Sequence, residues 1–99
     1  MTLLHNFSSV RAMSLTPEQC RAARALLGWT QDELAARAEL SRGTVRGFER
    51  GQHSLHRSTA RALRQVFEEE GIVLLGPDES GGIGVRRAAS LGSSGGNNG

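Results

Sequence analysis

Helix-start and helix-stop signals alternate so closely between residues 16 and 71 that this stretch has to fold into several short helices. The expected N-cap residues are Thr16, Thr30, Ser41 and Ser58, and the expected C-terminal glycines are Gly28, Gly51 and Gly71. Gln19 and Glu33 stand three positions after the first two caps and complete capping boxes, and Pro17 suits the first helical position. Apolar residues repeat at helical spacing between these signals. The pattern predicts an all-α small bundle of four to five short helices.

The apolar period changes after Gly71. Residues 72–75 form a short apolar run, residues 76–82 supply turn chemistry, and residues 83–86 alternate, which predicts a short C-terminal β-hairpin or strand. A lone hairpin is marginal in water, so we expect residues 72–87 either to dock on the first and fourth helices or to form a dimer contact with a second copy. The expected division of the chain is a flexible arm (residues 1–15), a helical domain (16–71), the hairpin extension (72–87) and a disordered tail (88–99). The sequence does not distinguish between Met1 and Met13 as the start of translation.

Composition narrows the class of protein. A chain of 99 residues buries too little surface to sustain a deep cavity, which argues against an enzyme with a sequestered pocket. The single cysteine, Cys20, excludes an internal disulfide, and the three histidines show no zinc-ligand spacing. No apolar run approaches the roughly 18 residues of a membrane span, and the N-terminus lacks a signal-peptide pattern. We therefore expect a cytoplasmic protein with no membrane contact, metal or cofactor.

Charge is segregated along the chain. All twelve basic residues are arginine, and six of them stand between residues 41 and 64 against Glu49 alone. Residues 65–80 carry five acidic residues and no basic one. This distribution indicates that one face of the protein is basic and suited to binding an anionic partner. Two short helices joined by a tight turn, the second rich in arginine, are typical of a domain that reads DNA.

Four short motifs follow one another between residues 24 and 51. They are Arg-x-x-x-Gly-Trp-Thr-Gln (24–31), Glu-Leu-Ala (33–35), Ser-x-x-Thr-Val (41–45) and Phe-Glu-Arg-Gly (48–51). In this order and at these separations they resemble the Cro/repressor-type helix-turn-helix family, also called XRE-like, over roughly residues 16–70. The resemblance implies a lambda-repressor-like bundle that binds double-stranded DNA.

The resemblance also implies which residues meet the DNA. The third helix would lie in the major groove and present Ser41, Arg42, Gly43, Arg46 and Gly47 to the bases. Phosphate contacts would come from Gln31, Arg50 and Arg57. The chemistry agrees, because Arg42 and Arg46 share one helix face and an arginine can chelate O6 and N7 of guanine. The two glycines would let the helix backbone approach the groove closely, at some cost in helix stability.

Other positions are expected to hold the scaffold together. The resemblance implies that Arg24 and Glu49 form a buried ion pair between the first and third helices, with an exposed pair as the alternative. The turn between the two motif helices usually holds a glycine with positive φ. It holds Glu39 here, which costs about 1 kcal/mol and puts the docking angle of the third helix in question. Trp29 and Phe48 are expected in the core rather than as platforms for bases, and Cys20 is expected to be buried.

These observations favour a sequence-specific DNA-binding transcriptional regulator, in its simplest form a repressor, that binds a two-fold operator as a homodimer. An antitoxin that also grips a toxin is the alternative, although residues 88–99 are short and polar for a toxin-neutralising segment. A protein-binding adaptor on the same scaffold is less favoured, because it would lack arginines at the groove-facing positions. An enzyme is least favoured, since His53 and His56 have no nucleophile or oxyanion donor near them in the pattern.

Overall fold

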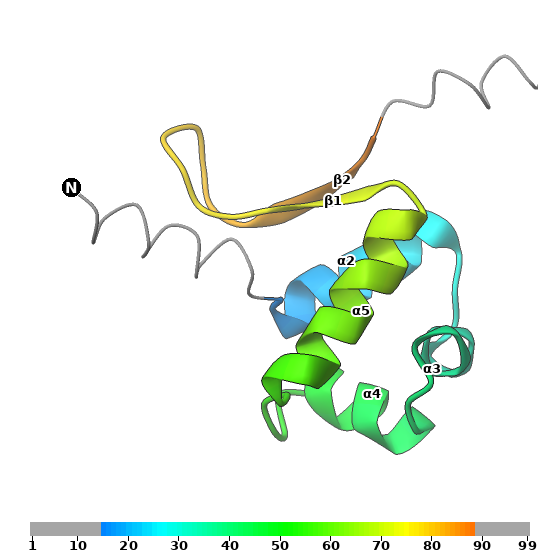
Figure 1. Ribbon diagram of the computed structural model, residues 1–99. Coiled ribbons are helices and arrows are strands. Elements are labelled where there is room, and N and C mark those ends of the chain that lie inside the picture. Colours follow the sequence, from blue (N-terminus) through cyan, green and yellow to red (C-terminus); the bar gives the residue numbers. More distant parts are fainter. Residues whose placement is uncertain (1–14, 89–99) are drawn as a thin grey trace, which may run out of the picture.

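The computed structural model describes residues 15–88, so the expected arm and tail lie outside the described residues apart from Leu15 and Ala88. Within this range, helices are followed by a two-stranded antiparallel sheet, as the sequence predicts (Figure 1). The helices are α2 (Pro17–Leu27), α3 (Gln31–Ala38), α4 (Arg42–Glu49) and α5 (Arg57–Glu69), and the strands are β1 (Ile72–Leu75) and β2 (Gly84–Arg87). None of these helices is long and apolar enough to cross a membrane.

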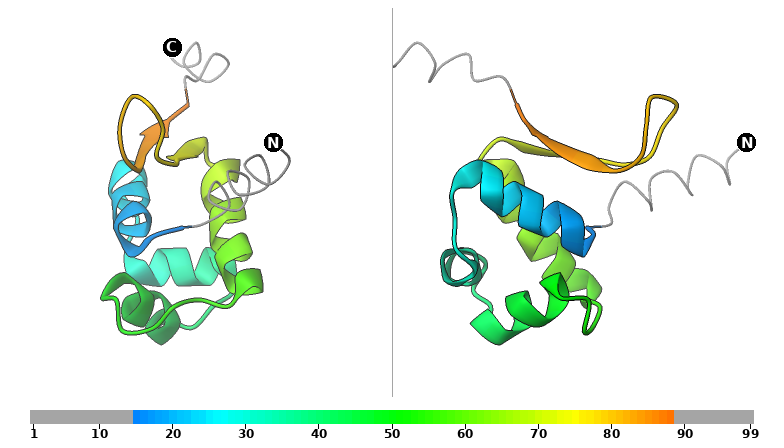
Figure 2. Two further views of the ribbon diagram at one scale, coloured as in Figure 1. Left: turned by 90° about the vertical axis from the view of Figure 1, so that its left-hand side faces the viewer. Right: turned by 180° about the vertical axis from the view of Figure 1, so that it is seen from behind.

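The hairpin and α4 occupy opposite ends of the molecule. β1 lies against α5 and β2 against α2, so the hairpin covers one end of the helical bundle. α4 contacts α2 and α3 and lies at the far end in each of the three views (Figures 1 and 2). α5 runs from the end that holds α4 to the hairpin (Figure 1). The exposed side of α4 is therefore remote from the sheet.

Local capping sets where three of the helices begin. Thr16, Thr30 and Ser41 each accept a hydrogen bond from the backbone N–H three residues later, as predicted. The prediction for α5 is wrong, because its N-cap is His56 and Ser58 already lies in the first turn. His56 has extended backbone angles, φ −62° and ψ 153°, and Arg57 is the first helical residue, so the hydroxyl of Ser58 comes too late in the chain to cap this helix.

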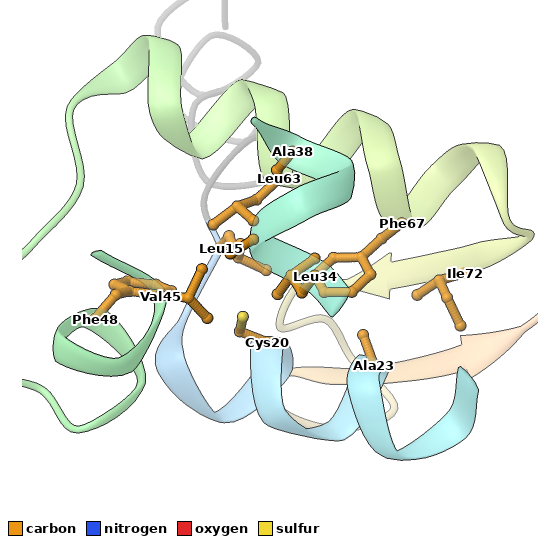
Figure 3. Packing of buried hydrophobic residues seen from close by; sticks show 11 residues of the cluster. Leu15, Cys20, Ala23, Leu34, Ala38, Val45, Phe48, Leu63, Phe67 and Ile72 are labelled. Atoms are coloured by element: carbon orange, nitrogen blue, oxygen red, sulfur yellow. The ribbon is translucent and has the colours of Figure 1, made fainter. Parts of the chain in front are cut away.

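The core forms where the helices and β1 converge (Figure 3). Its largest fully buried side chains are Phe67, Leu34, Leu63, Ile72, Val45 and Cys20. Leu15, at the end of the expected arm, is 8% exposed and belongs to the same cluster. Phe48 is 4% exposed, and Trp29 packs against the core with its ring centroid 6.3 Å from that of Phe67, so both aromatic residues have the scaffold role that was expected.

The hairpin docks on its own chain, which is one of the two alternatives that the sequence left open. Ile72 is 2% exposed and joins the core. The Nε2 of Gln19 donates to the carbonyl oxygens of Leu75 and Gly84, at 2.9 and 3.0 Å, while its Oε1 completes the capping box of α2. The second strand begins one residue later than predicted, at Gly84, because Ile83 stays outside the ladder and is 45% exposed.

Candidate nucleic-acid interface

α4 has one buried and one exposed face. Val45 and Phe48 point into the core, at 0% and 4% exposure (Figure 3). The exposed residues are Ser41, Arg42, Gly43 and Arg46, which are four of the five candidates for base contact. Ser41 also fixes the start of the helix, because its Oγ accepts from the backbone N–H of Thr44 at 3.0 Å. The arginines therefore stand one turn apart on a surface that no other part of residues 15–88 covers.

Gly47, the fifth candidate, differs from the other four because it is buried. A Cβ added at this position would lie 2.5 Å from Nε2 of His53 and 3.5 Å from Oε1 of Gln52. At Gly43, by contrast, the nearest such atom is Oγ of Ser41 at 3.9 Å. The loop that follows α4 packs over Gly47, which accounts for a residue without a side chain at this position. Gly43 has open space beside it, next to the exposed arginines.

Basic groups continue from α4 into the start of α5. Arg50 is the exposed C-cap residue of α4, and Arg57 is the exposed first residue of α5. The N-cap of α5 makes no side-chain hydrogen bond, so the N–H groups of its first turn and its positive dipole end stay available to an anion. Glu68, Glu69 and Glu70 stand at the opposite end of α5, where Glu68 pairs with Arg64 at 2.8 Å.

The carboxylate of Glu49 joins α2, α3 and α4. Its side chain is 1% exposed, and Arg24 donates to it from Nε and from Nη2, each at 2.8 Å. Nε2 of Gln31 donates to Oε1 at 2.9 Å, and the thiol of Cys20 donates to Oε2 at 3.0 Å. The Arg24–Glu49 pair is therefore bidentate, with a buried carboxylate and an arginine side chain that is 19% exposed. Two further donors, which the sequence did not connect with the pair, support it.

These contacts determine the ionisation of the network. Burial by itself raises the pKa of Glu49, but the hydrogen bonds from Arg24, Gln31 and Cys20 outweigh it and hold that pKa below its ordinary value. The hydrogen bond to Glu49 raises the pKa of Arg24. Burial, together with the hydrogen bond and charge of Glu49, raises the pKa of the Cys20 thiol. Cys20 is therefore a protonated donor in the scaffold and lacks the thiolate character of a reactive cysteine.

Gln31, a candidate for phosphate contact, is the first residue of α3 and already uses its side-chain amide to bind Glu49. Its backbone N–H has no partner within an α-helix at that position, so it is the group that remains for an external acceptor. The position thus combines a scaffold contact on one side with a free donor at the helix terminus on the other.

One ion pair at this surface was missed by sequence reasoning. Nη1 of Arg42 lies 3.2 Å from Oδ2 of Asp32, and the two side chains are 64% and 62% exposed. Asp32 is the second residue of α3 and Arg42 the first of α4, so the pair bridges the two helices of the motif. No helical or strand periodicity links residues on different elements, and no sequence signal could have found this contact.

The turn between α3 and α4 keeps the conformation that usually calls for glycine. Glu39 has φ 59° and ψ 44°, and its N–H is bonded to the carbonyl oxygens of Ala35 and Ala36. It is the only non-glycine residue with positive φ among residues 15–88. The chain thus accepts a strained residue at this position while retaining the turn.

Comparison with known protein families agrees with this arrangement. A family model described as "Helix-turn-helix" matches residues 21–71, which extend from within α2 to the residue before β1. A comparison with curated proteins finds no match. The matched region contains every candidate DNA-contacting residue and excludes the hairpin.

Proposed function

Because the chain belongs to the helix-turn-helix family, we propose that it is a sequence-specific DNA-binding transcriptional regulator whose α4 enters the major groove. The exposed, arginine-bearing face of α4 is the observation that carries this proposal. Arg42 and Arg46 read base edges, with guanine as the favoured partner, while Ser41 and Gly43 let the start of the helix approach the groove. Gly47 supports this face from within the domain.

Phosphate contacts on either side of α4 fix its position in the groove. Arg50 and Arg57 bind one strand where α4 ends and α5 begins, with help from the uncapped N-terminus of α5. The backbone N–H of Gln31 binds the other side through the positive end of α3. Occupancy of an operator by this domain excludes other proteins from the same DNA, so repression is the simplest regulatory outcome.

We further propose that two copies bind a two-fold operator and that β1 joins them. A single α4 covers about half of a typical site, and two half-sites lie about one helical turn apart. The sheet has only two strands within residues 15–88, so the backbone groups on its outer edges can pair with another strand. The hairpin covers the end opposite α4, so a two-fold axis perpendicular to the sheet leaves both copies of α4 facing the same way (Figure 2).

The two edges of the sheet differ in charge. β2 carries Arg86 and Arg87, which would face their own copies across a two-fold axis and repel each other. β1 has the sequence Ile-Val-Leu-Leu and carries no charge. Self-pairing through β1 therefore gives a continuous four-stranded sheet without like charges at its centre.

The DNA proposal is tested by selection from a random duplex library, followed by fluorescence anisotropy on the selected site at two salt concentrations. The wild type is compared with Arg42→Ala/Arg46→Ala and with Arg86→Ala/Arg87→Ala, which removes the same charge from the opposite end. We expect a palindromic site, affinity that falls steeply with salt, and loss of selectivity in the α4 variant alone. Equal affinity of the wild type for all duplexes, or an equal loss of selectivity in both variants, would contradict the major-groove assignment.

The dimer is tested by sedimentation of the wild type, Val73→Glu and Val73→Thr. Val73 is paired with Arg86 within the hairpin, so a glutamate there keeps the hairpin through an attractive pair but repels its copy across the β1 edge. We expect dimer for the wild type and the threonine control, and monomer for the glutamate variant. A dimer in all three would place the interface elsewhere.

A further inference from the structure

We propose that Asp32 is a positioning residue for base recognition, which holds the guanidinium of Arg42 so that one defined edge faces a guanine. The inference rests on the proposed function, because it concerns how Arg42 reads DNA rather than whether it does. Asp32 is not among the residues that the helix-turn-helix motif assigns to DNA in this chain. It acts through Arg42 and touches no base itself.

The atoms used in the Asp32–Arg42 contact leave a particular part of the arginine available. Nη1 donates to Oδ2 of Asp32 at 3.2 Å, and the side chain of Arg42 makes no other hydrogen bond within residues 15–88. Nε and Nη2 therefore remain, and they are the same two donors with which Arg24 binds the two oxygens of Glu49. O6 and N7 of guanine offer two acceptors to such a fork.

Arg46 provides an internal contrast on the same helix face. It is exposed like Arg42, but it makes no side-chain hydrogen bond in the part of the chain that the structure describes. An arginine that is held before binding loses less conformational freedom on binding than one that is not. We therefore expect Arg42 to discriminate between bases more sharply than Arg46, and to owe that difference to Asp32.

The negative charge of Asp32 also weakens DNA binding, and this second effect can be measured separately from positioning. A carboxylate at the DNA-facing end of α3 repels phosphates, so its presence lowers the affinity for every duplex. If Asp32 acted only through this repulsion, its removal would raise the affinity for every duplex and would change no base preference. The two roles separate because repulsion acts on all sequences equally, whereas positioning acts only on the base pair that Arg42 reads.

The experiment measures the affinity of the wild type and of Asp32→Asn for the selected site and for sites with single base-pair changes. Arg42→Ala and Arg46→Ala first identify which base pair each arginine reads. In Asp32→Asn we expect tighter binding to unrelated duplexes, and a loss of discrimination of about two- to fivefold at the base pair read by Arg42 alone. In an Arg42→Ala background, Asp32→Asn should leave discrimination unchanged. The single variant Asp32→Glu should keep part of the discrimination that Asp32→Asn loses. Glu39→Gln, which neutralises another exposed carboxylate of the motif, is the matched control and should leave every base preference intact.

The outcomes separate this inference from the proposal on which it rests. If Arg42→Ala abolishes one base preference and Asp32→Asn preserves it, the positioning role is overturned and the DNA-binding proposal stands. An equal effect of Asp32→Asn at the base pairs of Arg42 and Arg46 would overturn it too, because a general change in fold or charge would then suffice. If Arg42→Ala changes no base preference, the base assignment fails and the role of Asp32 fails with it.

Discussion

Replacing Arg24 with methionine should destabilise the fold far more than any other single loss of an ion pair in this domain. The substitution keeps much of the side-chain volume but leaves the carboxylate of Glu49, which is 1% exposed, without its charged partner. Gln31 and Cys20 still donate to that carboxylate, but neither carries a positive charge. Breaking a buried pair by removing one partner costs about 3–5 kcal/mol.

Arg42→Met is the matched control, since it breaks an ion pair whose side chains are 64% and 62% exposed. Such a pair contributes less than about 1 kcal/mol. Urea unfolding followed by circular dichroism measures both variants, and an unchanged dependence on urea shows that the midpoint reports stability. The double variant Arg24→Met/Glu49→Met should be more stable than Arg24→Met, because no buried charge is left alone. The reasoning is refuted if Arg24→Met costs no more than Arg42→Met.

The same carboxylate predicts a dependence on pH. The pKa of Glu49 is lowered in the folded state, so its contribution to stability is fully present above the unfolded value of about 4.3 and is lost as pH falls through the folded pKa. The difference in unfolding free energy between the wild type and Glu49→Gln should therefore shrink below about pH 4. A difference that stays constant from pH 7 to pH 2 would show that Glu49 does not carry this charge in the fold.

Four further outcomes test local features of the domain. Gly43→Ala should raise the unfolding free energy by about 1 kcal/mol, because Gly43 is exposed within a helix. Gly47→Ala should gain less, since the new Cβ would lie 2.5 Å from Nε2 of His53, and equal gains in urea unfolding would argue against that packing. Glu39→Gly should stabilise the domain by about 1 kcal/mol by relieving the φ of 59°, and a lower urea midpoint would count against strain. The buried Cys20 thiol, whose pKa is raised, should react with a thiol reagent at pH 8 far more slowly in the folded than in the urea-unfolded protein, and equal rates would contradict its burial.

Features that depend on neighbouring residues could be predicted from the sequence. The caps at Thr16, Thr30 and Ser41 each involve a residue three positions away, and helix geometry alone brings those atoms together. The amphipathic pattern of α4 likewise follows from its period, which separates Val45 and Phe48 from the two arginines. The cap of α5 was mispredicted because the loop after Gly51 decides where the chain enters that helix, and loop geometry has no periodicity.

The Arg24–Glu49 pair was expected only because the motifs resemble a known family, since the residues are 25 positions apart. The additional donors to Glu49 come from positions 18 and 29 residues away, and Gln19 reaches a carbonyl group 65 residues along the chain. The contact between Asp32 and Arg42, and the burial of Gly47 beneath His53, likewise depend on how separate elements pack.

The sequence by itself therefore determined the helices, their order and the exposed face of α4. Only the tertiary structure decided which polar groups meet, because those distances depend on how the helices and the hairpin close around a shared core.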